Sequence, residues 1–413
     1  MRQAVPIPFT DAWPGRRILE TVRHYRRRSW RWARVVSEWR PGTAAPTQGM
    51  RRVLVVRLDA IGDFVLWSGA ALALRQWLGP DTHVTLAANS VWAELARDLN
   101  IADEVWPIRR SSLEWDGAYR TQVRLRVQGG RFAMAINPRF TREMMFGDSI
   151  MRWSRAPIRV GWHGEGHLLP ERERRWADGW YTQLFDHDVD ALHETERNAQ
   201  FLRLLGVPLD DVPAPKLFVY HRPLGGLDDL QTGYFVVFPG ASTAEKQWSA
   251  THFAAVARHV QEQTGWRAVL LGEAADAAMT HAVASQVPGA IDLAGRTSVA
   301  VLASAIERAK LVVSNDTSAV HLAAATGVPA VCVVGGWQWR RFVPYPSSLG
   351  EVADRVETVA MEQEMGCFSC NWNCVRPRVP GETIPCVAAV PLSRVVEAVD
   401  RVLSKMNVVQ PHG

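Results

Sequence analysis

The sequence has few cysteines and no long apolar run. Its 413 residues include only 5 cysteines, too few for a disulfide framework in a chain of this length. No uncharged apolar stretch reaches about 18 residues, and no apolar signal core precedes a cleavage site near the N-terminus. No predicted strand is followed by GxGxxG, which argues against a dinucleotide oxidoreductase. These absences predict a globular, cytoplasmic protein.

Positive charge is scarce outside the N-terminal extension, residues 1–48. This extension holds ten arginines against three acidic residues, a balance of +7, and the whole chain carries +5, so the rest carries −2. A nucleic-acid surface needs Lys and Arg clustered on the folded domain. Nucleic acid is therefore not an expected partner.

The extension itself predicts a basic amphipathic helix between Arg16 and Arg40. Its mostly apolar face recurs at steps of three and four residues, at Ile18, Val22, Tyr25, Ser29, Trp32, Val36 and Trp39. A linker, PGTAAPTQG, follows. Such a helix suits a peripheral position on the anionic inner-membrane surface, or docking on the protein's own surface or another subunit. Both alternatives stay open.

The remaining chain alternates apolar strand-like runs with helix-like runs, twice over. This pattern predicts an α/β fold with two doubly wound, Rossmann-like parallel-sheet domains that face a central cleft. We expect an N-terminal domain over 49–220 and a C-terminal domain over 221–390. A C-terminal helix and tail occupy 391–413.

Three strand-to-helix junctions carry polar residues. In RLDAIGDF, Asp59 and Asp63 follow a predicted strand, so each acid is either a cap or a reagent. In SNDTSAVHLAAATG, Asp316 or Thr317 caps a helix whose positive dipole end suits a phosphate group, although simple capping explains it equally. FPGASTAEKQW repeats the arrangement with Ser242, Thr243 and Lys246, and Lys246 is either an anion ligand or a solvated surface residue. 

These motifs, in this order and together with HETERNAQFLRLLG and DLAGRTSVAVLASAI, resemble glycosyltransferase family 9, the ADP-heptose:lipopolysaccharide heptosyltransferases. The resemblance runs from about Arg52 to Leu403. It implies a GT-B fold with the acceptor in the first half and the nucleotide sugar in the second. It also implies inverting transfer of a heptose-type sugar from ADP-heptose to a lipopolysaccharide core-type acceptor, with no metal ion or other cofactor required.

The resemblance also implies residue roles. Asp63 matches the general base and Lys246 a lysine beside the donor diphosphate, so both are candidate catalytic residues. The donor-binding set is Gly62, Ser242, Thr243, Lys246, Asp316, Thr317, Ser318, Ala319 and His321. Three features depart from the family pattern: Asp59 stands where a hydroxyl is usual, Ser318 where glycine is common, and GGWQWRRF replaces a Gly-Pro-Thr ending. His193 is expected to be an ordinary helix-start residue.

Four cysteines gather in a loop at 367–386, namely Cys367, Cys370, Cys374 and Cys386. Four thiolates suit a structural zinc or iron ion, and the alternative is free thiols. The loop resembles one in family members that glycosylate surface proteins and hold iron there. Asp186 and Asp188, in DHDVD, have the Asp-x-Asp spacing of a metal-dependent transferase, but acids at a helix start explain them as well.

Three other functions remain open beside transfer to lipopolysaccharide. The first is an autotransporter-type heptosyltransferase that modifies protein hydroxyls. The second is a nucleotide-sugar epimerase, also built on two doubly wound halves. The third is a non-catalytic nucleotide-sugar binding protein that keeps the cleft without the base.

Overall fold

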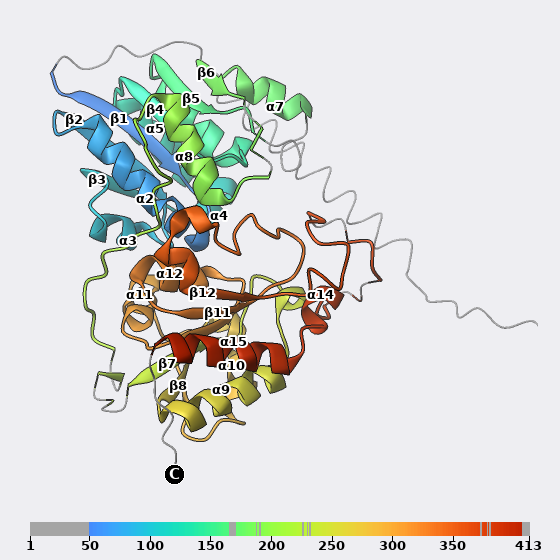
Figure 1. Ribbon diagram of the computed structural model, residues 1–413. Helices are drawn as coiled ribbons and strands as arrows, with labels where there is room; N and C mark the ends of the chain where they lie inside the picture. The colour runs from blue at the N-terminus through green and yellow to red at the C-terminus, as the bar shows by residue number, and fades with distance from the viewer. Residues whose placement is uncertain are drawn as a thin grey trace, which may run out of the picture.

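A computed structural model of the chain describes residues 49–164, 171–186, 188–189, 191–224, 227–228, 230, 233–371, 374–377, 379 and 381–406. The N-terminal extension, with its predicted helix, lies outside the described residues. Figure 1 shows two halves, one above the other, with an extended segment running between them along one side. Among the described helices, none combines the length and apolar character needed to cross a membrane.

The first half is a six-stranded sheet covered by helices on both faces. Its strands are β1 (Arg51–Arg57), β2 (Thr82–Asn89), β3 (Glu104–Ile108), β4 (Met134–Asn137), β5 (Ile158–Trp162) and β6 (Gln183–Phe185). Its helices are α2 (Ile61–Leu78), α3 (Ala93–Asp98), α4 (Arg110–Trp115), α5 (Gly117–Gly129), the π-helix η1 (Met144–Asp148), α6 (Ser149–Ser154), α7 (Glu171–Asp178) and α8 (Glu194–Leu205).

The second half repeats this plan. Its strands are β7 (Tyr234–Phe238), β8 (Arg267–Leu270), β9 (Ile291–Asp292), β10 (Val312–Asn315), β11 (Ala330–Val333) and β12 (Val356–Val359). Its α-helices are α9 (Ala250–Thr264), α10 (Ala277–Ala284), α11 (Val299–Glu307), α12 (Ser318–Thr326), α13 (Glu351–Asp354), α14 (Pro385–Ala388) and α15 (Leu392–Lys405). Short 3₁₀ turns lie at η3 (Ala244–Lys246), η4 (Ala274–Asp276) and η5 (Ser347–Leu349).

The two sheets have the same strand order. The first runs β3-β2-β1-β4-β5-β6 and the second β12-β11-β10-β7-β8-β9, with parallel neighbours throughout. The order reverses between β1 and β4 and between β7 and β10. Ligands of doubly wound sheets bind outside the carboxyl ends of strands at such a switch point. The predicted α/β fold of two Rossmann-like units is confirmed.

Alternation along β1 shows how the sequence builds the layers. Val53 and Val55 pack with α2, α3 and α8, whereas Leu54 and Val56 point to the opposite face and pack with α5 and α6. This period of two, with apolar side chains on both faces, is what a central strand of a covered parallel sheet requires. Because β1 is a central strand, its end and the start of α2 lie at the carboxyl edge of the sheet.

The halves meet through α2 and α12. The apolar cluster that covers one face of the first sheet continues without a break into the face of the second sheet under α11 and α12. At the contact, a Cβ atom on Gly62 would stand 2.9 Å from Cδ2 of His321, closer than real Cβ atoms approach a neighbour. The two helices can therefore come this close because residue 62 has no side chain.

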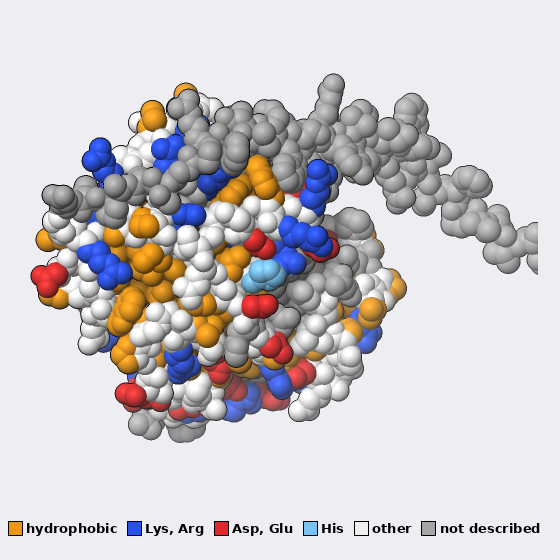
Figure 2. All heavy atoms as spheres, turned by 90° about the horizontal axis from the view of Figure 1, so that it is seen from above, with side chains coloured by type: hydrophobic (Ala, Val, Ile, Leu, Met, Phe, Trp, Pro, Cys, Tyr) orange, Lys and Arg blue, Asp and Glu red, His pale blue; other side chains and the backbone are white. Residues whose placement is uncertain are grey.

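Figure 2 views the first half from above, on the side away from the second half. Outside the grey atoms, its Lys and Arg side chains are separated by apolar, acidic and neutral surface. A phosphate backbone needs a continuous basic track. The face seen in this view does not provide one.

Substitution of Gly62 by alanine tests the helix contact. We expect Gly62→Ala to lower the free energy of unfolding by about 1–3 kcal/mol, because the added methyl group must displace His321 or separate the helices. Thermal or denaturant unfolding measures this. Gly129→Ala, at the end of α5 with open space around its Cβ position, is the matched control and should be neutral or slightly stabilising. Equal effects of both substitutions would contradict the tight contact.

Candidate active site

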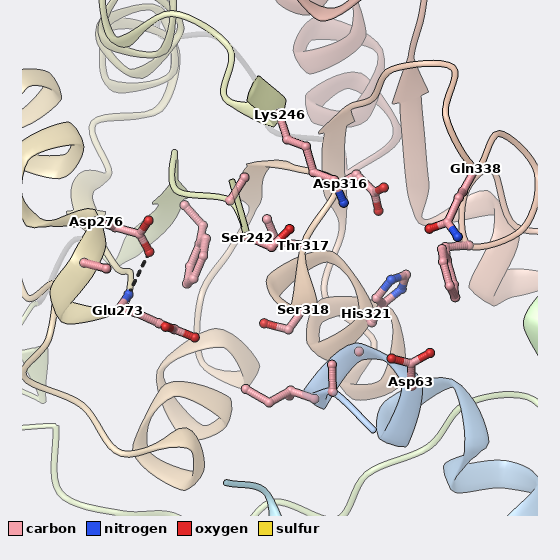
Figure 3. A pocket seen from close by; sticks show the side chains of 17 residues that line it. Asp63, Ser242, Lys246, Glu273, Asp276, Asp316, Thr317, Ser318, His321 and Gln338 are labelled. Carbon is pink, nitrogen blue, oxygen red and sulfur yellow. Dashed lines mark hydrogen bonds between the residues drawn. The ribbon is translucent and has the colours of Figure 1, made fainter. Parts of the chain in front are cut away.

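A cavity of about 420 Å³ lies where the start of α2 faces the carboxyl edge of the second sheet (Figure 3). Five segments supply its walls: the start of α2 and the loops that follow β7, β8, β10 and β11. The lining residues are Ala60, Ile61, Gly62, Asp63, Phe238, Ala241, Ser242, Lys246, Glu273, Ala275, Asp276, Asp316, Thr317, Ser318, His321, Gln338 and Phe342. Both halves therefore contribute to one cavity at their switch points.

Most of the residues singled out from the motifs line this cavity. Gly62, Asp63, Ser242, Lys246, Asp316, Thr317, Ser318 and His321 all do so. The exceptions are Thr243 and Ala319. Thr243 is exposed beside η3, and Ala319 is fully buried in the core on the inner side of α12. A helical step of three residues puts Ser318 and His321 on one face, and Ala319 is turned away from it.

Lys246 and Asp316 lie on the second-half side of the cavity. In Figure 3 the Lys246 side chain reaches toward Asp316. Burial lowers the pKa of Lys246, and the charges of Asp316 and Asp63 oppose that shift. Burial likewise raises the pKa of Asp316, against the opposing charge of Lys246. The lysine Nζ also stands 4.9 Å from the centre of the Trp337 ring. The ammonium group is thus held in place at the wall.

The N-terminus of α12 opens on the cavity. Thr317 is its N-cap, and its hydroxyl accepts a hydrogen bond from the backbone N–H of Ala319. Of the two caps expected from the sequence, Thr317 is the one that forms, which leaves the Asp316 carboxylate to the cavity. Ser318, at the position where the family commonly has glycine, lines the wall at the positive end of the helix dipole.

His321 lies one turn further along α12. Its Nδ1 is 2.8 Å from the Tyr345 hydroxyl, and its ring is buried. Burial lowers the pKa of His321 to about 3, with a smaller contribution from His193. The imidazole is therefore neutral at physiological pH. It interacts with a ligand through a hydrogen bond rather than through a charge.

The two acids of RLDAIGDF occupy different environments. Asp63 is in the first turn of α2 and lines the cavity, close to His321 in Figure 3. Asp59 is buried outside the lining, with its Oδ2 2.6 Å from Nε of Arg57 and 3.9 Å from Nε of Arg139. Burial raises the pKa of Asp59 to about 6 despite these arginines, and the charge of Asp63 adds to the rise.

The divergent GGWQWRRF loop connects the halves. Gln338 and Phe342 line the cavity. The backbone carbonyl of Arg341 accepts a hydrogen bond of 2.8 Å from the N–H of Glu194, at the start of α8. The Phe342 carbonyl lies 2.8 Å from Nε2 of His193. His193 is the N-cap of α8, as expected for an ordinary helix-start residue, and it also anchors this loop.

Several wall residues were not identified from the sequence: Phe238, Ala241, Glu273, Ala275, Asp276, Gln338 and Phe342. Glu273 follows the end of β8 after Leu271 and Gly272, so its place at the carboxyl edge of a strand was the available signal. Asp276 accepts a hydrogen bond of 2.9 Å from the Glu273 N–H. A Cβ on Gly240 would stand 2.3 Å from Cγ of Asp276, so glycine is needed where these two loops cross.

The cysteine loop lies in the second half, apart from the cavity lining. Gly336 N–H donates to Sγ of Cys386 at 3.4 Å, and Nε of Arg376 donates to Sγ of Cys367 at 3.4 Å. Burial raises the pKa of Cys386, and the neighbouring Cys370 and Cys374 add to the rise. Within the described part of the chain, no three His, Cys, Asp or Glu side chains are arranged to hold a metal ion.

A family comparison gives one clear match. The model of glycosyltransferase family 9 (heptosyltransferase) matches residues 149–372, more than half of the chain. This span contains the β7, β8, β10 and β11 loops that line the cavity. No curated protein matches the sequence.

Solved structures share the fold over most of the chain. A glycosyltransferase family 9 protein from Veillonella parvula is 19% identical with a TM-score of 0.69, covering 87% of this chain and 99% of that one. ADP-heptose LPS heptosyltransferase II from E. coli is 18% identical with a TM-score of 0.62, covering 86% and 99%. The iron-containing dodecameric heptosyltransferase TibC, in complex with ADP-D-beta-D-heptose, is 12% identical with a TM-score of 0.52, covering 88% and 78%. These likenesses identify the fold as GT-B.

Proposed function

Because the chain belongs to glycosyltransferase family 9, the heptosyltransferase family, we infer that it transfers a heptose-type sugar from ADP-heptose to a hydroxyl of a lipopolysaccharide core-type acceptor. One observation carries the proposal. A carboxylate from the first half, Asp63, shares a cavity with a lysine and a helix N-terminus from the second. These are the groups that an inverting displacement of a nucleoside diphosphate needs.

The donor would occupy the second-half side of the cavity. The positive end of α12 and the Lys246 ammonium group would receive the diphosphate, which carries the negative charge of the leaving group. A neutral His321 would donate or accept a hydrogen bond beside it. Glu273 has a carboxylate suited to accept hydrogen bonds from ribose hydroxyls. ADP-heptose is the donor named for two of the structural relatives.

The transfer step then follows from the two sides of the cavity. Asp63 takes the proton from the acceptor hydroxyl, and the acceptor oxygen forms a bond to the anomeric carbon. The bond between that carbon and the diphosphate oxygen breaks, and ADP leaves with the electron pair. Attack opposite the leaving group inverts the anomeric centre. In this proposal Lys246 and α12 stabilise the departing diphosphate, so no metal ion is required.

A protein hydroxyl is the second candidate acceptor. The cysteine loop is compatible with it, because the loop resembles one in family members that glycosylate surface proteins. The reaction at the cavity would be the same for either acceptor. Comparing a lipopolysaccharide core acceptor with a serine-containing peptide as the substrate distinguishes them.

Substitutions of the two charged residues should separate turnover from donor binding. Asp63→Asn should lower kcat by about 10²–10⁴-fold and leave the Kd for ADP nearly unchanged, because the amide cannot accept the proton. Lys246→Met should raise the Kd for ADP by about 10- to 100-fold, because a charge-assisted contact to phosphate is lost. Release of ADP in the presence of a chelator, and calorimetric titration with ADP, measure the two effects.

Exposed residues of the same types provide controls for that experiment. Asp211→Asn and Lys405→Met should match the wild type in both assays. Full turnover by Asp63→Asn would rule out its role as the base. An unchanged Kd for ADP in Lys246→Met would rule out the proposed donor position.

We propose that the cysteine loop binds a structural zinc or iron ion, for which the four thiols would have to draw closer together than in the described structure. Purified protein is expected to contain about one such ion per chain, and the double variant Cys367→Ser and Cys370→Ser should lose it and unfold at a lower temperature. Elemental analysis and thermal unfolding measure this. Cys332→Ala, in the buried strand β11 and outside the loop, is the control and should keep the metal. Metal-free protein with four freely titrating loop thiols would contradict the proposal.

The arginine-rich extension should bind anionic membrane surfaces. Replacing Arg26, Arg27 and Arg28 together by glutamine should weaken binding to vesicles that contain an anionic lipid by about 100-fold, since each arginine contributes about 1 kcal/mol near such a surface. Vesicle sedimentation at several salt concentrations measures this. Equal binding of wild type and variant would favour docking of the extension on a protein surface.

A further inference from the structure

Three arginines converge on the loop between β1 and α2. Arg57 comes from β1, Arg110 from α4, and Arg139 from the loop after β4. The Arg57 side chain is fully buried, and its Nη2 donates to the backbone carbonyl of Asp63 at 3.3 Å. Nη1 of Arg110 donates to the Leu58 carbonyl at 2.6 Å. The guanidinium groups therefore shape the turn that carries the candidate base.

Each of these arginines also forms an ion pair with a carboxylate other than that of Asp63. Arg110 and Arg139 both pair with Glu143. Arg57 pairs with Asp59 at 2.6 Å, and Glu194 stands 3.7 Å from its Nη2. Arg139 is also 3.9 Å from Asp59. Asp59 is thus the closest counter-charge of Arg57 and a second counter-charge of Arg139.

We propose that Asp59 is a positioning residue, which neutralises Arg57 and Arg139 so that the Asp63 carboxylate stays in the cavity instead of pairing with them. The proposal rests on the base role given to Asp63 above. Asp59 is itself held in place, because its backbone carbonyl accepts hydrogen bonds of 2.9 Å from Nδ2 of Asn89 and from Nε1 of Trp92. Without the Asp59 carboxylate, Arg57 would keep Glu194, 3.7 Å from its Nη2, and Asp63, whose backbone carbonyl it already contacts, would be the acid of the cavity open to it.

The electrostatics of the cluster agree with this geometry. The groups that act on the Asp59 carboxyl are Arg57 from β1, Asp63 from α2, Arg139 from the loop after β4, and Glu194 from α8. Asp63 and Asp59 both raise the pKa of Arg110 and of Arg139 against the lowering effect of burial. The two acids thus act on the same two arginines, so loss of the Asp59 charge increases the share of Asp63, beside Glu143, in balancing them.

Charge substitutions with opposite signs test the proposal on the full-length protein. Asp59→Ser should move the acid limb of the pH–kcat profile down by about one pH unit and lower kcat at pH 7.5 by about 3- to 30-fold, because the arginines then hold the base in its ionised, less basic form. Arg57→Met should move the acid limb up, because Asp59 then repels the Asp63 charge. The double variant Arg57→Met and Asp59→Ser should return the limb close to its wild-type position.

This pattern distinguishes positioning from a merely structural role. If Asp59 had only a structural role, kcat would fall in all three variants and the acid limb of the pH–kcat profile would stay at the wild-type pH. That result would overturn the proposal. If Asp59→Ser does not fold, Arg57→Met and the double variant still give the required upward shift and its reversal, since neutral residues replace the buried pair together. Asp59→Glu, which keeps the charge, should retain the wild-type limb position.

The same series separates this proposal from the proposed function. If Asp63→Asn is inactive and the limb does not move in the Arg57 and Asp59 variants, only the positioning role fails. If Asp63→Asn keeps full turnover, the base assignment fails, and the positioning role fails with it.

Discussion

The cavity depends on how closely two helices from different halves can approach each other. α2 and α12 each begin at the switch point of their own sheet, and their first turns face each other where Gly62 meets His321. Since residue 62 has no side chain, the helices approach closely and the carboxylate of Asp63 lines the same cavity as the positive end of α12. If α2 and α12 were further apart, Asp63 and the nucleotide site of the second half would not line one cavity. The carboxylate could then not act in the reaction at the nucleotide site.

The GGWQWRRF loop adds to this constraint because it is both a wall and a connection. Phe342 lines the cavity, and its carbonyl contacts His193 at the start of α8. Burial lowers the pKa of His193 to about 4, so the ring is neutral and accepts from Thr195 while its Nε2–H faces the carbonyl. The loop that departs from the family pattern thus joins the second half to the first.

The sequence predicted the central strands and the long helices well, because their apolar runs are buried whatever the neighbouring chain does. It did not reveal the interior strand β5 or the edge strands β3, β6 and β12, and these edge strands are short and partly polar, with Pro107 in β3. The motif residues that follow β1, β7 and β10 line the cavity because strand ends at one edge of a sheet lie together. The exact position of Phe342 could not be predicted, because its carbonyl contacts His193 at the start of α8, far away in the sequence.

Asp59 shows why a single departure from a family pattern is hard to interpret without neighbours. Alone, an acid beside a candidate base looks unfavourable, since two carboxylates repel each other. The Arg57 side chain, however, is fully buried, and its Nε lies 2.6 Å from Oδ2 of Asp59. A buried guanidinium group without a carboxylate partner strongly destabilises a fold, so the Asp59 charge is favourable here. Arg57 and Asp59 are therefore a unit, and a hydroxyl at residue 59 would leave Glu194, 3.7 Å from Nη2 of Arg57, as the remaining carboxylate paired with this arginine. Arg57 ends β1 and Asp59 stands two positions further on, the spacing at which side chains of an extended chain share one face, so the sequence alone favours their contact.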